Sequence, residues 1–268
     1  MISESFAFST TSRLHEWYIA CNFVIINFME NKRNYQRELE KIIENTEKQL
    51  KDCSYSDSDN MIPSLFIHAC CAPCSSYCLE YLCKYFRITV FYYNPNITFE
   101  AEYVHRVEEE KRLIAEYNQE MKAGSREGYE IDVVEGKYDP ENFYAMAKGL
   151  EMVPEGGERC FKCFELRLRE TFEEAKRQMA GGRKIDYITT TLTISPLKNA
   201  VKLNEIGEAM QDEYGVKWLP SDFKKKNGYK RSIELSAEYD LYRQDFCGCV
   251  YSKAERDRDK QKDLYKDI

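Results

Sequence analysis

Residues 64–96 read SLFIHACCAPCSSYCLEYLCKYFRITVFYYNPN, and this stretch contains two strand patterns separated by a helix pattern. The runs SLFIHA (64–69) and ITVFYYNPN (88–96) are apolar segments of strand length. Between them, Pro73 stands where a first-turn proline opens a helix over SSYCLEYLCKYF (75–86). A strand, a helix and a second strand in this order favour a parallel sheet.

The alternation of strands and helices continues along the chain. Residues 98–120 form a charged helix pattern, 129–136 and 184–191 are further strand patterns, and 199–215 is a helix that ends at Gly215. We therefore predict an α/β fold of the Rossmann-like, HUP-like kind, a mostly parallel sheet with helices on both faces. In such sheets the functional site lies outside the carboxyl ends of the strands, which places a cysteine-rich site there.

Composition limits the classes of function. The chain has 268 residues and a net charge of −7, which argues against broad electrostatic coating of nucleic acid, although a local basic patch remains at KKKNGYKR (224–231). The apolar segment Trp17–Met29 is too short for a membrane span and no small-residue cleavage site follows it. We therefore expect a cytoplasmic protein without a membrane partner.

The chain divides into four parts. Residues 1–28 are interpreted as an N-terminal extension or a mis-assigned start, and residues 29–60 as an amphipathic helix followed by the polar linker DCSYSDSDN. Residues 61–252 form the predicted catalytic domain, and residues 253–268 a charged tail.

Three cysteine groups stand out: the first follows a predicted strand, the second comes after a glycine turn and opens a predicted helix, and the third flanks Gly248. They are Cys70, Cys71 and Cys74; Cys160 and Cys163; and Cys247 and Cys249. Cys74 lies in the first turn of a helix, where the dipole favours thiolate. Adjacent cysteines form a disulfide only with strain, and cytoplasmic thiols stay reduced, so the pattern indicates metal binding or redox catalysis.

The groups suit different chemistry. Cys70, Cys71, Cys160 and Cys163 supply the four thiolates of a four-iron cluster, or of a zinc site. The C-x-C of Cys247 and Cys249, with Gly248 between them, suits a redox-active disulfide. Cys74 is left as a spare thiolate for a further metal or for substrate.

The cysteines and histidines also have structural interpretations that do not involve catalysis. A single C-x2-C is often a structural zinc knuckle, and Cys78 and Cys83 are best read as small buried hydrophobes. His68 is equally a ligand or a packing residue, while His105 is expected at the surface.

Four ordered motifs carry a family resemblance: HACCAPC (68–74), ERCFKCFELRL (158–168), DYITTTLTISPLKN (186–199) and YDLYRQDFCGCVYS (239–252). Together they resemble epoxyqueuosine reductases of the QueH type, the cobalamin-independent enzymes of queuosine biosynthesis. The resemblance implies reduction of epoxyqueuosine at the tRNA wobble position to queuosine, the last step of that modification. It also implies 4Fe-4S ligation by Cys70, Cys71, Cys160 and Cys163, and a redox-active disulfide of Cys247 and Cys249.

The residues fit that chemistry. Removing an epoxide oxygen needs two electrons and a Lewis acid or proton donor. Our hypothesis is that the oxygen binds an iron at or beside the cluster, with Cys74 as a ligand of an additional iron ion, while Cys247 and Cys249 form a disulfide. The sequence does not identify the electron donor.

Candidate contacts to a tRNA carrying epoxyqueuosine lie in loops, in the basic patch and beside the C-x-C. The same residues also have structural interpretations, as polar loop residues, solvated surface charges or core packing. The candidates are Asn94, Asn96, Thr193, Ser195, Lys198, Asn199, Lys224, Lys225, Lys226, Lys230, Arg231, Tyr239, Tyr242 and Tyr251.

Two other classes of protein remain open. A zinc-stabilised RNA-binding protein explains the C-x2-C and the basic patch but not the C-x-C, and a thiol–disulfide oxidoreductase explains only the C-x-C. An iron–sulfur protein is brown, whereas the other two are colourless. A nucleotide-dependent enzyme is disfavoured because the sequence has neither a P-loop nor a G-x-G-x-x-G motif.

Overall fold

The computed structural model describes residues 33–51 and 61–264. The predicted extension at 1–28 and the linker at 52–60 lie outside these residues. Helix α2 (Tyr35–Lys51) forms within the predicted N-terminal helix and buries Leu39 and Ile43 in the core.

Five parallel strands form one sheet in the order β3-β2-β1-β4-β5. The strands are β1 (Ser64–Ala69), β2 (Arg87–Tyr92), β3 (Asp132–Glu135), β4 (Tyr187–Thr190) and β5 (Lys217–Trp218). The strand order reverses between β1 and β4, which is the position where open α/β sheets bind ligands.

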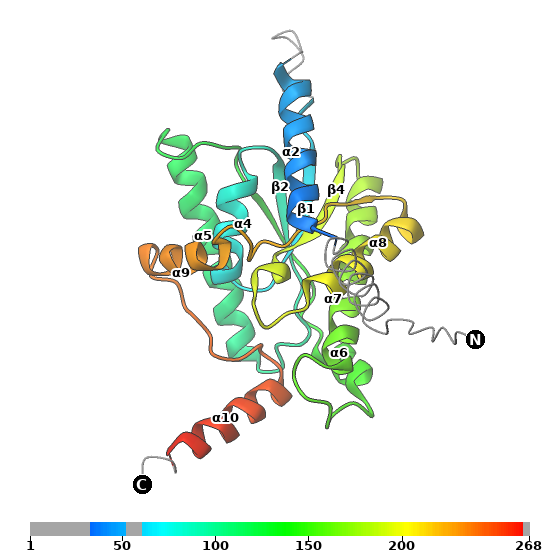
Figure 1. The fold of residues 1–268 in the computed structure, drawn as a ribbon, viewed down its shortest axis with the longest axis vertical. Coiled ribbons are helices and arrows are strands. Elements are labelled where there is room, and N and C mark those ends of the chain that lie inside the picture. The colour runs from blue at the N-terminus through cyan, green and yellow to red at the C-terminus, as the bar shows by residue number, and fades with distance from the viewer. Residues whose placement is uncertain (1–32, 52–60, 265–268) are drawn as a thin grey trace, which may run out of the picture. The chain divides into compact units, whose positions relative to one another are not determined.

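Helices cover both faces of the sheet, as predicted (Figure 1). Helices α4, α5 and α9 lie on one side in Figure 1, and α7 and α8 on the other. The helices that follow β1 are α4 (Ala72–Leu82), α5 (Glu100–Lys122), α6 (Pro140–Ala147), α7 (Glu158–Ala180), the 3-10 helix η1 (Thr191–Ile194), α8 (Ala200–Tyr214), α9 (Gly228–Glu238) and α10 (Val250–Leu264).

Burial explains why strands β1 and β2 are mainly apolar. Alternate side chains of a strand point to opposite faces of a sheet. Leu65 and Ile67 of β1 therefore pack with α4 and α5, whereas Phe66 packs with Leu168 and Phe172 of α7 on the other face. The α/β fold predicted from the sequence is confirmed.

The carboxyl ends of the strands lie level with one another. Ala69 pairs with Tyr92 of β2, and His68 pairs with Thr190 of β4. The buried His68 ring connects β1 to β4 and to the residue after β2, because Nδ1 lies 2.9 Å from Thr190 Oγ1 and Nε2 lies 3.1 Å from the Tyr93 carbonyl oxygen. Burial lowers the pKa of His68 to about 3, so the ring is neutral and serves packing.

The structure adds features that the sequence patterns did not predict. Strand β5 has two residues, and α6 and α9 were not predicted as helices. Helix α10 continues through residue 252, where the boundary of the charged tail was predicted. Across residues 33–51 and 61–264, the longer helices are all too polar to cross a membrane.

Candidate active site

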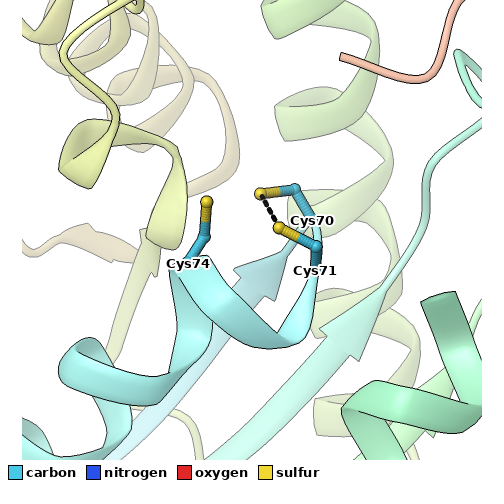
Figure 2. Close-up of side chains that lie close together, drawn as sticks. All are labelled: Cys70, Cys71 and Cys74. Atoms are coloured by element: carbon cyan, nitrogen blue, oxygen red, sulfur yellow. Dashed lines mark hydrogen bonds between the residues drawn. The ribbon is translucent and has the colours of Figure 1, made fainter. Parts of the chain in front are cut away.

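The first cysteine group sits in the turn between β1 and α4 (Figure 2). Cys70 follows the last residue of the strand, Cys71 precedes the first residue of the helix, and Cys74 lies in the first helical turn. The sulfurs of Cys70 and Cys71 are 3.7 Å apart, and all three sulfurs lie within 4.8 Å of one another. The turn therefore gathers three thiols from five consecutive residues.

These sulfurs lie close enough together to bind metal at one place. Neighbouring side chains also donate to the sulfurs: Gln244 Nε2 to Cys71 Sγ at 2.7 Å, and Thr191 Oγ1 to Cys70 Sγ at 3.7 Å.

The three thiols are not equivalent in acidity. Hydrogen bonds from Cys71 and then Cys74 lower the pKa of Cys70 well below its usual value. The pKa of Cys74 is raised because of its hydrogen bonds with Cys70 and Cys71, and burial adds to the effect. The helix dipole led us to expect a thiolate at Cys74, but the neighbouring sulfurs outweigh it and favour the thiolate at Cys70.

The second group lies in α7, which begins at Glu158 after the Gly156–Gly157 turn. Cys160 is half-buried, and its sulfur accepts the N–H of Gly156 at 3.3 Å. Cys163 is buried one turn later against Phe143 of α6. As predicted, the C-x2-C falls near the start of a helix.

The third group forms a clamped loop before α10. The Cys247 carbonyl oxygen accepts hydrogen bonds from Arg106 Nη1 at 3.2 Å and Asn96 Nδ2 at 3.4 Å. Gly248 has a φ of 116°, and a Cβ there would lie 2.8 Å from Ile97. The loop therefore requires glycine between its two cysteines.

Two adjoining cavities bring the three cysteine groups together. A cavity of about 290 Å³ is lined by Cys70, Cys74 and Cys247, and a smaller one of about 20 Å³ by Cys160, Cys163, Cys247 and Cys249. Cys247, Arg167 and Glu155 line both. All seven predicted site cysteines thus converge, Cys71 through its contact with Cys70, at the carboxyl edge of the sheet.

Arg167 is a buried cation among these sulfurs. Its side chain is 1% exposed, Nη1 donates to Asn94 Oδ1 at 3.3 Å, and Nη2 has no hydrogen-bond partner among the described residues. Its strongest electrostatic neighbours that favour the charged form are Cys163 and Cys247. A buried cation is costly unless an anion compensates it, so the position calls for negative charge on the sulfurs.

The residues therefore fit a metal–thiolate centre. Cys70 and Cys71 pack in one cluster with Cys160, and Cys163 lies in the next turn of the same helix as Cys160. The possible metal ligands are all cysteine sulfurs. Arg167 Nη2, which has no hydrogen-bond partner among the described residues, can donate a hydrogen bond to a sulfur atom of a bound cluster. Cys74 also belongs to the close group, which makes it available to a second metal.

The loop residues predicted to touch substrate separate into two sets. Ser195 and Lys198 line the larger cavity. The other four have structural partners: Asn94 with the Ala69 carbonyl and Arg167, Asn96 with Cys247, Thr193 with Ser221, and Asn199 as the cap of α8. Burial lowers the pKa of Lys198, but Cys247 and Cys70 outweigh burial and raise it.

Acidic side chains partly neutralise the basic patch. Lys224 pairs with Asp222, Lys226 with Glu40, Lys230 with Glu234, and Arg231 with Glu80. Lys225 is exposed.

The three tyrosines near the C-x-C also have partners. Tyr239 binds Glu120, the Tyr242 hydroxyl lies 3.2 Å from Glu102, and Tyr251 stacks with Arg159. His105 is exposed beside Tyr242, as expected, and Cys78 and Cys83 lie in the core.

Sequence reasoning missed several residues of the site. Arg167 stands one helical turn after Cys163, a spacing that puts both on one face and could have revealed it. Gln244 stands three residues before Cys247, and no pattern marks it. Glu110 belongs to an acidic run that predicts a solvated surface, yet it is buried, and burial raises its pKa to about 8.

Comparison with known proteins connects this site to one family. The family model for "Epoxyqueuosine reductase QueH" matches residues 65–255. A curated protein of that name from Staphylococcus epidermidis is 39% identical over 236 residues, which cover 87% of this chain and 90% of that protein. The Streptococcus pyogenes protein is 39% identical over 85% of this chain and 82% of its own length, and the Thermotoga maritima protein 31% identical over 75% and 95%.

Proposed function

Because the chain belongs to the QueH family of epoxyqueuosine reductases, we propose that it removes the epoxide oxygen of epoxyqueuosine in a tRNA anticodon, leaving the alkene of queuosine. The observation that carries the proposal is that six cysteines line two adjoining cavities that share Cys247, and that the seventh, Cys71, contacts Cys70. An oxidoreductase of this kind needs a source of electrons, a group that accepts the oxygen and a pocket for the nucleoside, all within one site.

We assign the ligands of a 4Fe-4S cluster to Cys70, Cys71, Cys160 and Cys163. Cys74, whose sulfur lies within 4.8 Å of those of Cys70 and Cys71, is assigned to an additional iron ion. When bound, these groups would supply single-electron transfer and a Lewis acid. Gln244 and Thr191 orient the sulfurs by hydrogen bonding, and Arg167 offsets their negative charge.

The dithiol of Cys247 and Cys249 would supply the two electrons and two protons that the reaction consumes. When two thiols become a disulfide, they release two electrons and two protons. The epoxide takes up both, loses its oxygen as water and becomes an alkene. A partner that donates two electrons then restores the thiols. Dense free cysteines suit a reducing compartment, so we propose that this cycle runs in the cytoplasm.

The larger cavity is the proposed place of the modified nucleoside. An enzyme that acts on a base takes that base out of the stack and into a pocket. Ser195, Lys198 and the exposed Arg243 line the cavity and offer polar contacts. Phosphate contact by Lys224, Lys230 or Arg231 would compete with the acidic partners of these residues. Tyr242 is retained as a candidate for base stacking.

The test is anaerobic purification, quantification of iron, sulfide and zinc, and a single-turnover assay on tRNA that carries epoxyqueuosine, with a chemical reductant. We expect about four irons per chain from the cluster, and queuosine as the product. Cys163→Ser should lose both, whereas Cys83→Ala should lose neither, because Cys83 lies in the core outside the cavities. Zinc in place of iron, with bound but unchanged tRNA, would refute the proposal.

A further inference from the structure

We propose that the two C-x-C sulfurs have distinct roles: Cys247 is the sulfur that exchanges with the reductant, and Cys249 is the buried partner that leaves and re-forms the disulfide. Ser252 is the residue that positions Cys249. The inference rests on the proposed function, because it assigns the steps by which the spent dithiol is restored.

The two sulfurs differ in access. Cys247 is half-buried and lines both the larger and the smaller cavity. Cys249 is 7% exposed, lines only the smaller cavity, and packs with Phe143 and Cys163. Thiol–disulfide exchange depends on access to the attacked sulfur, so a reductant reaches Cys247 first.

Ser252 holds Cys249 in place. The backbone N–H of Ser252 donates to Cys249 Sγ at 3.3 Å, and Cys249 Sγ lies 3.4 Å from Ser252 Oγ. Ser252 Oγ also donates to the Cys249 carbonyl oxygen at 3.1 Å. Ser252 is itself buried in the first turn of α10, so these contacts form a fixed seat for one sulfur of the pair.

The charge of the larger cavity favours attack on Cys247 by a reductant that enters through this cavity. Four basic side chains line that cavity, Arg106, Arg167, Lys198 and Arg243, against two acidic ones, Glu155 and Asp245. A reducing thiol attacks as the thiolate, which carries negative charge. This excess of positive charge attracts the reagent into the larger cavity, where it meets Cys247.

The exchange is balanced. A thiolate of a dithiol reductant attacks Cys247 Sγ in the oxidised loop, and the Cys247–Cys249 bond breaks with its electron pair on Cys249. Ser252 stabilises the departing sulfur by hydrogen bonding. The second thiolate of the reductant then attacks the mixed disulfide and releases Cys247 as a thiolate. Both cysteines take up protons, and the reductant ends as its own disulfide.

The test follows the site of attack directly. Full-length oxidised holoenzyme is treated anaerobically with glutathione, quenched with N-ethylmaleimide, and the peptide that contains both cysteines is sequenced by mass spectrometry. We expect glutathione on Cys247 and maleimide on Cys249. In the reduced Cys249→Ser enzyme, glutathione disulfide should give a stable adduct at Cys247, whereas Cys249 of Cys247→Ser should react at least tenfold more slowly. Adducts on Cys249, or an equal mixture, would overturn the assignment.

Ser252 is tested by rate. Ser252→Ala keeps the backbone N–H bond but removes the hydroxyl, which can turn from the Cys249 carbonyl to the departing thiolate. It should slow exchange about tenfold, the effect typical of one hydrogen bond to a charged group. Ser252→Thr should restore most of the rate, and Ser232→Ala, a buried serine of α9 outside both cavities, should leave it unchanged. An unchanged rate in Ser252→Ala would remove the Ser252 hydroxyl from the scheme. The exchange assays contain no tRNA, so they test the sulfur roles separately from the reaction on the nucleoside. A protein that shows asymmetric exchange but forms no queuosine in the single-turnover assay would refute the proposed function and leave the assignment of the two sulfurs standing.

Discussion

Arg167 Nη1 donates to Asn94 Oδ1 at 3.3 Å, and the amide nitrogen of the same asparagine donates to the Ala69 carbonyl oxygen at 2.8 Å. Asn94 follows β2, Ala69 is the residue before the double cysteine, and Arg167 stands one turn after the C-x2-C. This chain of bonds therefore fixes the distance between two cysteine groups that lie far apart in the sequence.

The first prediction concerns Arg167. Arg167→Gln removes a buried positive charge beside the sulfurs, so it should make reduction harder. Loss of an interaction of about 1.4 kcal/mol lowers a one-electron midpoint potential by about 60 mV. A redox titration of the proposed cluster after reconstitution, followed by electron paramagnetic resonance, measures this shift. Arg167→Lys keeps the charge and should keep most of the potential. Equal potentials in all three proteins would contradict the electrostatic role.

The second prediction concerns Cys74. Cys74→Ser should keep the iron and sulfide of the cluster but weaken a further metal site, with turnover reduced roughly 10–100-fold. Metal analysis separates this result from that of Cys71→Ser, which should lose the cluster itself. A Cys74→Ser enzyme with normal turnover would exclude this thiol from the reaction.

The third prediction concerns Lys198, whose charge faces Cys70 and Cys247 in the larger cavity. If it stabilises the departing oxygen, Lys198→Met should lower kcat about 100-fold. It should also weaken binding of tRNA with epoxyqueuosine more than binding of tRNA with queuosine, which lacks that oxygen. Filter binding of both tRNAs measures the difference, and Lys202→Met, on the exposed face of α8, is the matched control. Equal weakening of both tRNAs would show a general contact instead.

The fourth prediction concerns Glu110, which is buried and whose carboxylate oxygens have no hydrogen-bond partner among the described residues. Burial raises its pKa to about 8, above the value of 4.5 for the exposed group. The folded protein thus binds one more proton than the unfolded chain between these values, so this group costs stability as pH rises from about 4.5 to 8. Glu110→Gln should raise the free energy of unfolding at pH 7 by roughly 3 kcal/mol.

Urea unfolding at pH 6 and pH 8 measures that effect. Glu110→Gln should flatten the pH dependence over this interval. Glu109→Gln is the control: hydrogen bonding to Arg112 lowers the pKa of Glu109, so Glu109 stays ionised throughout. If Glu110→Gln left the slope unchanged, the buried carboxyl would already be ionised in the folded protein.

The sequence predicted those parts of the fold that hydrophobic periodicity controls. The range Ser64–Ala69 was predicted as a strand and is β1, because an apolar run bounded by a proline and a cysteine turn has few alternatives. Strand β5 was missed because Lys217 and Trp218 give too short a pattern, and Trp218 is held by packing against Gly207. Short strands of this kind are set by tertiary contacts.

The candidate site could be predicted where residue type alone suggests the chemistry. The cysteines were found in this way, and their convergence follows from the parallel sheet. Asn94 and Asn96 were proposed as substrate contacts because they follow a strand, but they bond to Arg167 and to Cys247, which sequence spacing does not show. Arg106 was not considered, because its carbonyl partners lie 140 and 141 residues away.

The neutral ring of His68 has a consequence for the proposed metal site. Both ring nitrogens are occupied by partners on the neighbouring strand β4 and just beyond the neighbouring strand β2. The loops that follow β1, β2 and β4 therefore begin at fixed backbone positions before any metal ion binds. Binding would then require little loss of conformational entropy from the backbone, so apo protein should keep its fold when chelators remove the metal, unlike small domains that are ordered by their ion.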